Sequence, residues 1–132
     1  MKILKTYPPN FEELNKKFEL NEFTVFTYGD KLYNPNNVAI SEDLIAHEET
    51  HVKQQGKDPK KWWRKYIDDK NFRLSQETEA YSNQYKAFKE MKKDRNERAR
   101  FLHFISCELS SSLYGNIIDY QEAKERIENF VL

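Results

Sequence analysis

Apolar and polar residues alternate with a β-type period only near the beginning of the chain, and they follow a helical period through the rest. The stretch "EFTVFTYGDKLYN" carries β-branched and aromatic residues on both sides of Tyr28, Gly29 and Asp30, which predicts a β-hairpin. "NNVAI" predicts one more short strand. Amphipathic helices are predicted over residues 11–18, 42–55, 59–67, 72–92, from 95 into "FISCEL", and over 120–132.

Helix boundaries follow from polar caps, glycine and proline. Gly56 is a suitable C-terminal stop for the helix over 42–55, and Pro59 stands at the first position of the next helix. The order of elements predicts an α+β, mainly helical fold, with a small N-terminal β-hairpin or sheet packed on a pair of helices and further helices toward the C-terminus. The expected N-caps are Asn10, Ser41, Asp58, Asp94 and Asp119.

Composition narrows the class of protein. The 132 residues suffice for one domain, residues 1–132, with a single modest core. The 22 Lys and Arg balance the 22 Asp and Glu, so we expect no nucleic-acid partner. Aromatic residues make up 14% of the chain, so we expect a largely aromatic core that includes Trp62, Trp63 and Tyr66, and we expect Cys107 to be an inert core thiol.

Long apolar segments are missing from the sequence. No stretch approaches the ~18 apolar residues of a membrane span, and the first residues, "MKILKTYPPN", lack the apolar region of a signal peptide. We therefore expect no membrane association, no signal peptide, and a location in the cytoplasm of the producing cell.

The motif "HEETH" at residues 47–51 carries the candidate chemistry. In a helix, positions i and i+4 share one face, so His47 and His51 can both reach one zinc ion at roughly 2 Å. Glu48 then faces the open position of the metal, where a carboxylate can act as general base toward a zinc-bound water. Glu49 points the other way, toward solvent. The spacing is typical of a zinc peptidase helix, but a bare match of this length also occurs by chance.

A catalytic zinc site requires a third protein ligand. On a helical wheel Glu77 falls on the apolar face of its helix, whereas Glu79 falls on the opposite face with charged residues. A buried carboxylate needs a partner, which makes Glu77 the favoured ligand, and a salt bridge to Arg73 is the alternative. Glu79 and His103 stay open as replacement ligands, although a lone histidine on an aromatic helix is more often packed and hydrogen-bonded.

Tyr81 lies one turn after Glu77. It is a candidate catalytic residue, because its hydroxyl can orient a ligand or stabilise an oxyanion, although core packing is the alternative for any single tyrosine.

The quoted residues also resemble known proteins. "HEETHVKQQ" followed by "ETEAY" is similar to the gluzincin type of zinc metallopeptidase, in which the first glutamate of an E-x-x-A-[D/N] pattern is the third ligand. That resemblance implies a zincin-like helix pair with Glu77 as the ligand, and Tyr81 stands where the family commonly has Asp or Asn. "GDKLYNP", "WWRKYIDD", "FRLSQETEAYSNQY" and "LSSSLYGNII" further resemble small HExxH proteins of tailed bacteriophages.

Three functions are compatible with these residues. The first is a zinc-dependent metallopeptidase that cuts a peptide or protein substrate, for which phage virion proteins are candidates. The second is a structural phage virion protein that keeps a zincin fold and binds other virion proteins without catalysis, and that is packaged in the virion. The third is another hydrolase with the same zinc chemistry. The presence of Glu48 favours an enzyme, whereas a chain of 132 residues is expected to leave little room for a deep specificity cleft.

Overall fold

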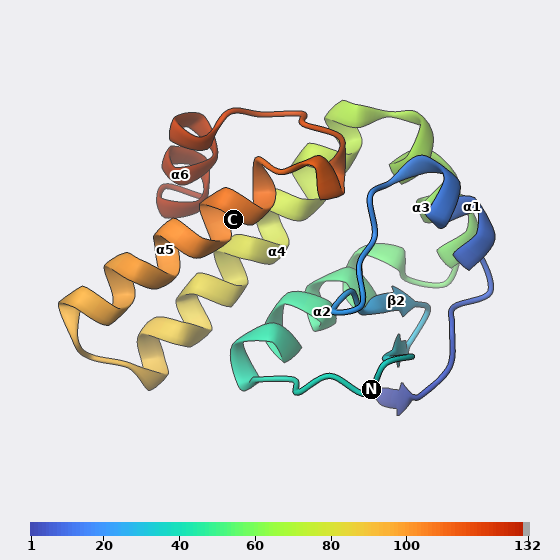
Figure 1. Ribbon diagram of the computed structural model, residues 1–132, viewed down its shortest axis with the longest axis horizontal. Helices are drawn as coiled ribbons and strands as arrows, with labels where there is room; N and C mark the ends of the chain where they lie inside the picture. Colours follow the sequence, from blue (N-terminus) through green and yellow to red (C-terminus); the bar gives the residue numbers. More distant parts are fainter. Residues whose placement is uncertain (131–132) are drawn as a thin grey trace.

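The computed structural model describes residues 1–130 and confirms the α+β, mainly helical class. Figure 1 shows a long central helix, α4, with the strands and α1 to α3 toward one end of the molecule and α5 and α6 toward the other. The elements are β1 (Lys2–Leu4), α1 (Phe11–Lys17), β2 (Phe26–Tyr28), β3 (Lys31–Tyr33), α2 (Glu42–Gln55), α3 (Pro59–Asp68), α4 (Lys70–Met91), α5 (Arg95–Leu109), the 3-10 helix η1 (Ser112–Tyr114) and α6 (Tyr120–Glu128).

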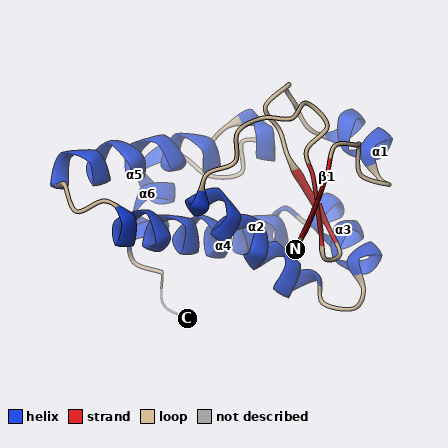
Figure 2. Ribbon diagram, turned by 90° about the horizontal axis from the view of Figure 1, so that it is seen from below, coloured by secondary structure: helices blue, strands red, loops and turns tan. Residues whose placement is uncertain are grey.

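The sheet has three short strands in the order β1-β3-β2. Strands β2 and β3 form the predicted antiparallel hairpin, with Gly29 at a positive φ of 66° in the turn. Strand β1 runs parallel to β3 and was not predicted, because three residues are too few to display a period. Figure 2 shows the sheet at the same end of the molecule as α1 and α3.

The strand predicted for "NNVAI" is wrong. The side chain of Asn34 accepts from the backbone N–H of Val38 and donates to its carbonyl, so both backbone groups of Val38 are engaged locally. Asn37 adopts a positive φ of 50° that a strand does not accommodate.

The predicted caps are partly confirmed. The side chains of Asp58, Asp94 and Asp119 accept backbone N–H bonds at the starts of α3, α5 and α6. Asn10 and Ser41 occupy their N-cap positions without a side-chain cap hydrogen bond. Helix α6 ends at Glu128, short of the predicted range, and the last two positions of that prediction, 131 and 132, lie outside the described residues.

Two apolar clusters hold the elements together. The larger joins α3, α4, α5, η1 and α6 through a core in which half of the buried residues are aromatic, and the smaller lies between α1, the sheet and the end of α3. Trp62 and Tyr66 are buried in the larger cluster, and Trp63 is half-buried between the two, as expected from the sequence. In the described part of the chain, no helix is long and apolar enough to cross a membrane.

The placement expected for Cys107 is wrong. Cys107 is exposed, because the buried stripe of α5 runs through Leu102, Ile105, Ser106 and Leu109, and position 107 falls about 100° from its neighbour in that stripe. The run "FLHFISCEL" that suggested a core position has apolar residues on both faces of α5, since Phe104 is also exposed.

Gln55 attaches the hairpin to the end of α2. Its side-chain oxygen accepts from the N–H of Gly29 at 2.7 Å, and its amide nitrogen donates to the carbonyl of Thr27 at 2.8 Å. Trp63 donates to the same carbonyl at 3.0 Å. These bonds fix the sheet against the face of α2 that carries both histidines, and so bring Thr27 to Glu48.

Candidate metal centre

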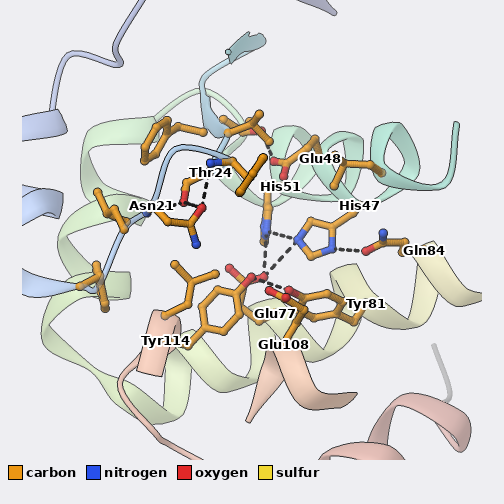
Figure 3. Close-up of a pocket in the computed structure, with 18 of the residues that line it drawn as sticks. Asn21, Thr24, His47, Glu48, His51, Glu77, Tyr81, Gln84, Glu108 and Tyr114 are labelled. Carbon is orange, nitrogen blue, oxygen red and sulfur yellow. Dashed lines mark hydrogen bonds and ion pairs between the residues drawn. The ribbon is translucent and has the colours of Figure 1, made fainter. Parts of the chain in front are cut away.

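His47, His51 and Glu77 converge between α2 and α4. These two helices make the most extensive contact between any two elements of the described chain. The Nε2 atoms of His47 and His51 lie 3.2 Å apart, and each lies 3.2 Å from Oε1 of Glu77. All three side chains are buried, and Figure 3 shows them pointing toward one another. The structure thus brings together the three residues that the sequence selected.

Two glutamines fix which nitrogen of each imidazole carries its hydrogen. Oε1 of Gln84 faces Nδ1 of His47 at 2.9 Å, and Oε1 of Gln54 faces Nδ1 of His51 at 2.7 Å. The amide orientation is chemically determined, because the other end of each glutamine donates to groups that can only accept. Gln84 donates to the carboxylate of Asp43, and Gln54 donates to a backbone carbonyl and to a carboxylate.

The consequence is a buried cluster of three acceptors. With hydrogen on Nδ1, the Nε2 atom of each neutral imidazole presents a lone pair, and both lone pairs meet a carboxylate oxygen at 3.2 Å. Such a group is unfavourable unless a proton or a cation lies between its members. Two imidazole nitrogens and one carboxylate oxygen form a usual ligand set for a catalytic zinc ion. The cluster could therefore hold a metal ion.

When no cation is bound, a proton can stabilise the three clustered acceptor atoms instead. Burial alone lowers the pKa of His51, but the charge of Glu77 and its hydrogen bond outweigh burial and raise the pKa to about 9. Burial alone raises the pKa of Glu77, but His51 and His47 hold it well below its usual range. The pair is thus an ion pair at neutral pH when no metal is bound.

A tyrosine other than the expected one contacts the carboxylate of Glu77. Tyr66 donates its hydroxyl to Oε2 of Glu77 at 2.5 Å. The hydroxyl of Tyr81 instead bonds that of Tyr114 at 2.7 Å, while its ring packs edge-on against His47 with 4.4 Å between ring centroids. Burial raises the pKa of both Tyr66 and Tyr81 well above the usual value, so both phenols stay protonated as donors. Tyr81 therefore supports the histidine by packing.

Glu48 lies on the sheet side of the cluster. Its Oε2 accepts from the hydroxyl of Thr27 at 2.5 Å, and no hydrogen bond within residues 1–130 engages its Oε1. Glu48 is buried and lines the same cavity as the histidines, whereas Glu49 is exposed, as expected. Glu48 is thus placed beside the cluster and is not among the three groups that converge.

The alternatives for the third ligand are not supported by the geometry. Glu79 accepts from Gln54, and His103 is exposed on α5, bonded to Tyr120. The salt bridge from Arg73 is wrong, because its guanidinium donates to three backbone carbonyls and forms no ion pair with Glu77.

Sequence reasoning missed the residues that form hydrogen bonds to His47, His51, Glu77 and Glu48. Gln84 carried a signal, since it is a polar residue on the apolar face of its helix, and such a residue needs a partner. Tyr66 and Gln54 carried none, because their positions suit core packing and a helix surface equally well. Thr27 lies on a strand whose contact with α2 no local pattern reveals.

A cavity of about 560 Å³ opens next to the cluster. Its volume is in the range of ligand-binding pockets and exceeds the small cleft expected for a short chain. The cavity is lined by residues of α1, the loop between α1 and β2, strand β2, α2 and its N-cap residue, α3, α4, α5 and η1. Most of its wall is apolar or aromatic, and it includes Leu14, Phe18, Leu20, Phe23, Val25, Phe101, Phe104, Leu113 and Tyr114.

Comparison of the chain with protein-family models, curated proteins and solved structures finds no match. The resemblance to gluzincins and to phage-encoded proteins therefore stays a prediction from the motif residues. The class that fold and site define is a mainly helical α+β protein with a buried His-His-Glu cluster at the wall of an apolar cavity.

Proposed function

We propose that this protein is a zinc-dependent metallopeptidase. The observation that carries the proposal is the convergence of three acceptor atoms at 3.2 Å from one another, with both imidazole hydrogens held on the far side by glutamines. This ligand set suits zinc, and three protein ligands leave a position for water or substrate, as catalytic zinc sites require.

Bound zinc would supply a Lewis acid that lowers the pKa of a coordinated water toward 7 and polarises a peptide carbonyl. Glu48 takes the proton from the attacking water with Oε1, which is not engaged by Thr27, and later delivers it to the leaving amine. Thr27 holds the other oxygen of Glu48 and thereby fixes the orientation of the base. Burial of Glu48 limits the contact of its carboxylate with bulk water.

Peptide hydrolysis is favoured over a purely structural zinc site by Glu48. A structural site needs only ligands, and a fourth protein ligand usually closes it. Here a buried carboxylate that is not one of the three convergent groups lies beside them and faces a cavity large enough for side chains of a substrate.

The first experiment measures metal content. Purified protein and the His47→Ala variant are dialysed against trace zinc and analysed by plasma emission spectrometry. We expect one zinc per chain in the wild type and a large loss in the variant. Zinc-free wild-type protein that does not take up zinc at micromolar concentrations would reject the proposal.

The second experiment separates an enzyme from a structural protein. In Glu48→Gln the side chain is nearly isosteric, so fold and zinc content should be retained, but turnover should fall by orders of magnitude, because the acceptor for the proton is lost. Wild type and variant are compared on an unbiased peptide library and on phage structural proteins. Cleavage that persists in the variant indicates a contaminant or another base, and cleavage absent from both favours the structural virion protein.

A further inference from the structure

Glu108 on α5 faces the cavity with a carboxylate that has no partner among residues 1–130. It lines the same cavity as His47, Glu48 and Glu77, and Figure 3 shows it drawn beside Tyr81. Among residues 1–130, no group donates a hydrogen bond to its carboxylate and no cationic side chain pairs with it. Glu108 is half-buried, and burial raises the pKa of its carboxyl group, with His47 acting in the opposite direction.

The other carboxylates of the cavity all have partners. Glu77 is bonded by Tyr66 and faces the histidines, Glu48 is bonded by Thr27, and Asp43 accepts from Gln84. A negative charge that is partly removed from water and left unpaired is costly in an otherwise satisfied site. Glu108 is therefore the carboxylate of the cavity that a ligand can pair with a positive charge or a hydrogen-bond donor.

Apart from the two histidines, the charged residues that line the cavity are all negative. Four carboxylates line it, and no Lys or Arg from the described part of the chain does, although the sequence contains 22 of them. A bound divalent cation neutralises only half of that negative charge. Walls with a low dielectric focus the remaining field into the cavity, which favours a positively charged ligand.

The wall near Glu108 is apolar. Phe101 and Phe104 precede it by seven and four positions on α5, so the three side chains share one face of the helix, and Leu113 follows on η1. Phe104 is 55% exposed at the mouth of the cavity, as is Phe23 of the facing loop at 69%. A ligand that fits these groups has an ammonium group close to a large apolar residue.

On the basis of the proposed peptidase function, we propose that Glu108 is a specificity-determining residue that binds a substrate ammonium group, so that the preferred substrates are peptides with a positive charge next to large apolar side chains. The ammonium group comes from a free peptide amino terminus or from a lysine side chain. Both present the same cation to a carboxylate.

The test measures binding of three matched tetrapeptide amides by isothermal titration calorimetry. All are built on the same large apolar residues: the first is acetylated and neutral, the second has a free amino terminus, and the third is acetylated with one residue replaced by lysine. Titrations use zinc-loaded Glu48→Gln protein, which does not turn over the peptides, and are repeated on metal-free wild-type protein, so that the result does not depend on activity.

We expect at least one cationic peptide to bind about tenfold more tightly than the neutral one, which corresponds to about 1.4 kcal/mol. Adding Glu108→Gln should abolish this preference while affinity for the neutral peptide is unchanged. Glu49→Gln, an exposed substitution of the same kind on α2, should keep the preference. The better of the two cationic peptides identifies the source of the ammonium group.

Equal affinity for all three peptides in Glu108-containing protein, or a preference that survives Glu108→Gln, would overturn the inference. The comparison among peptides needs no substitution at Glu108, so it remains decisive if Glu108→Gln folds poorly. Failure of the peptidase proposal has a different signature: charge preference persists in the binding data while wild-type protein cleaves none of the peptides.

Discussion

The hydroxyl of Tyr66 donates to Oε2 of Glu77 at 2.5 Å, which leaves Oε1 of the same carboxylate to face both histidines. The phenol therefore orients the carboxylate without competing for the oxygen that would bind a metal. A hydrogen bond of this kind also stabilises the charged form of Glu77, which is the form that binds a cation.

Replacing Tyr66 with Phe should lower zinc affinity by roughly 10- to 100-fold, because Glu77 loses the donor that orients it. Tyr81→Phe is the matched control, since the hydroxyl of Tyr81 bonds Tyr114 and no ligand. Competition titrations with a chromophoric chelator measure both affinities. Equal losses in the two variants would mean that Tyr81 supports the ligands as directly as Tyr66 does.

Glu77→Gln should reduce zinc affinity by more than about 100-fold, a larger effect than that of a residue outside the ligand set. Glu79→Gln should have a much smaller effect, because Glu79 accepts a hydrogen bond from Gln54 and lies outside the cluster. The same chelator competition distinguishes them. Comparable zinc loss in both variants would reject the assignment of Glu77 as third ligand.

Zinc should stabilise the folded protein, since its ligands come from α2 and α4 and are not arranged in the unfolded chain. At a free zinc concentration about 100 times the dissociation constant, the gain is about 2.7 kcal/mol, which raises Tm by roughly 10 °C. Thermal melts with chelator and with zinc measure the shift. The shift should vanish in His47→Ala, and an unchanged wild-type melt after chelation would exclude a role for zinc in stability.

The metal-free protein should lose stability as pH rises from about 6.5 to 9. The pKa of His51 is raised to about 9 in the folded state, so the stabilisation from its protonated form is complete below the unfolded value of about 6.5 and disappears as pH passes the folded value. The expected loss is about 3 kcal/mol. The lowered pKa of Glu77 acts only in acid, where its contribution is lost as pH falls below its unfolded value.

Urea unfolding at pH 6 and pH 9 with chelator present measures this loss, and His51→Gln should lack it. Zinc affinity should change in the opposite direction, rising with pH, because both histidines must be neutral to bind the metal. A metal-free protein that is equally stable at both pH values would contradict the ion pair between His51 and Glu77.

Local periodicity accounts for most of the fold and for the choice of His47, His51 and Glu77 as the convergent cluster. The helix over 42–55 and the hairpin are observed where the pattern predicted them. Within one helix the backbone fixes which positions share a face, so His47 and His51 could be paired from their spacing alone. Glu77 could be chosen over Glu79 for the same reason, because an apolar face indicates which side of α4 is buried.

Contacts between elements could not be predicted in this way. The parallel pairing of β1 with β3 joins residues far apart in sequence, and no local pattern specifies it. The segment around Val38 has a β-type composition but forms no strand. The side chain of Asn34 bonds both backbone groups of Val38 instead. Exposure of Cys107 depended on which stripe of α5 faces the core, and an apolar run without a clear period does not specify that stripe.

The sequence by itself determined the His47, His51 and Glu77 cluster and the adjacent Glu48, because these residues lie at fixed positions on two amphipathic helices. Only the tertiary structure decided what surrounds them. The packing of α2 on α4 sets Gln84 against His47, the placement of α3 brings Tyr66 to Glu77, and α5 brings Glu108 to the cavity. Periodicity reports which face of a helix is buried, whereas the side chain met across an interface depends on how two helices are placed relative to each other.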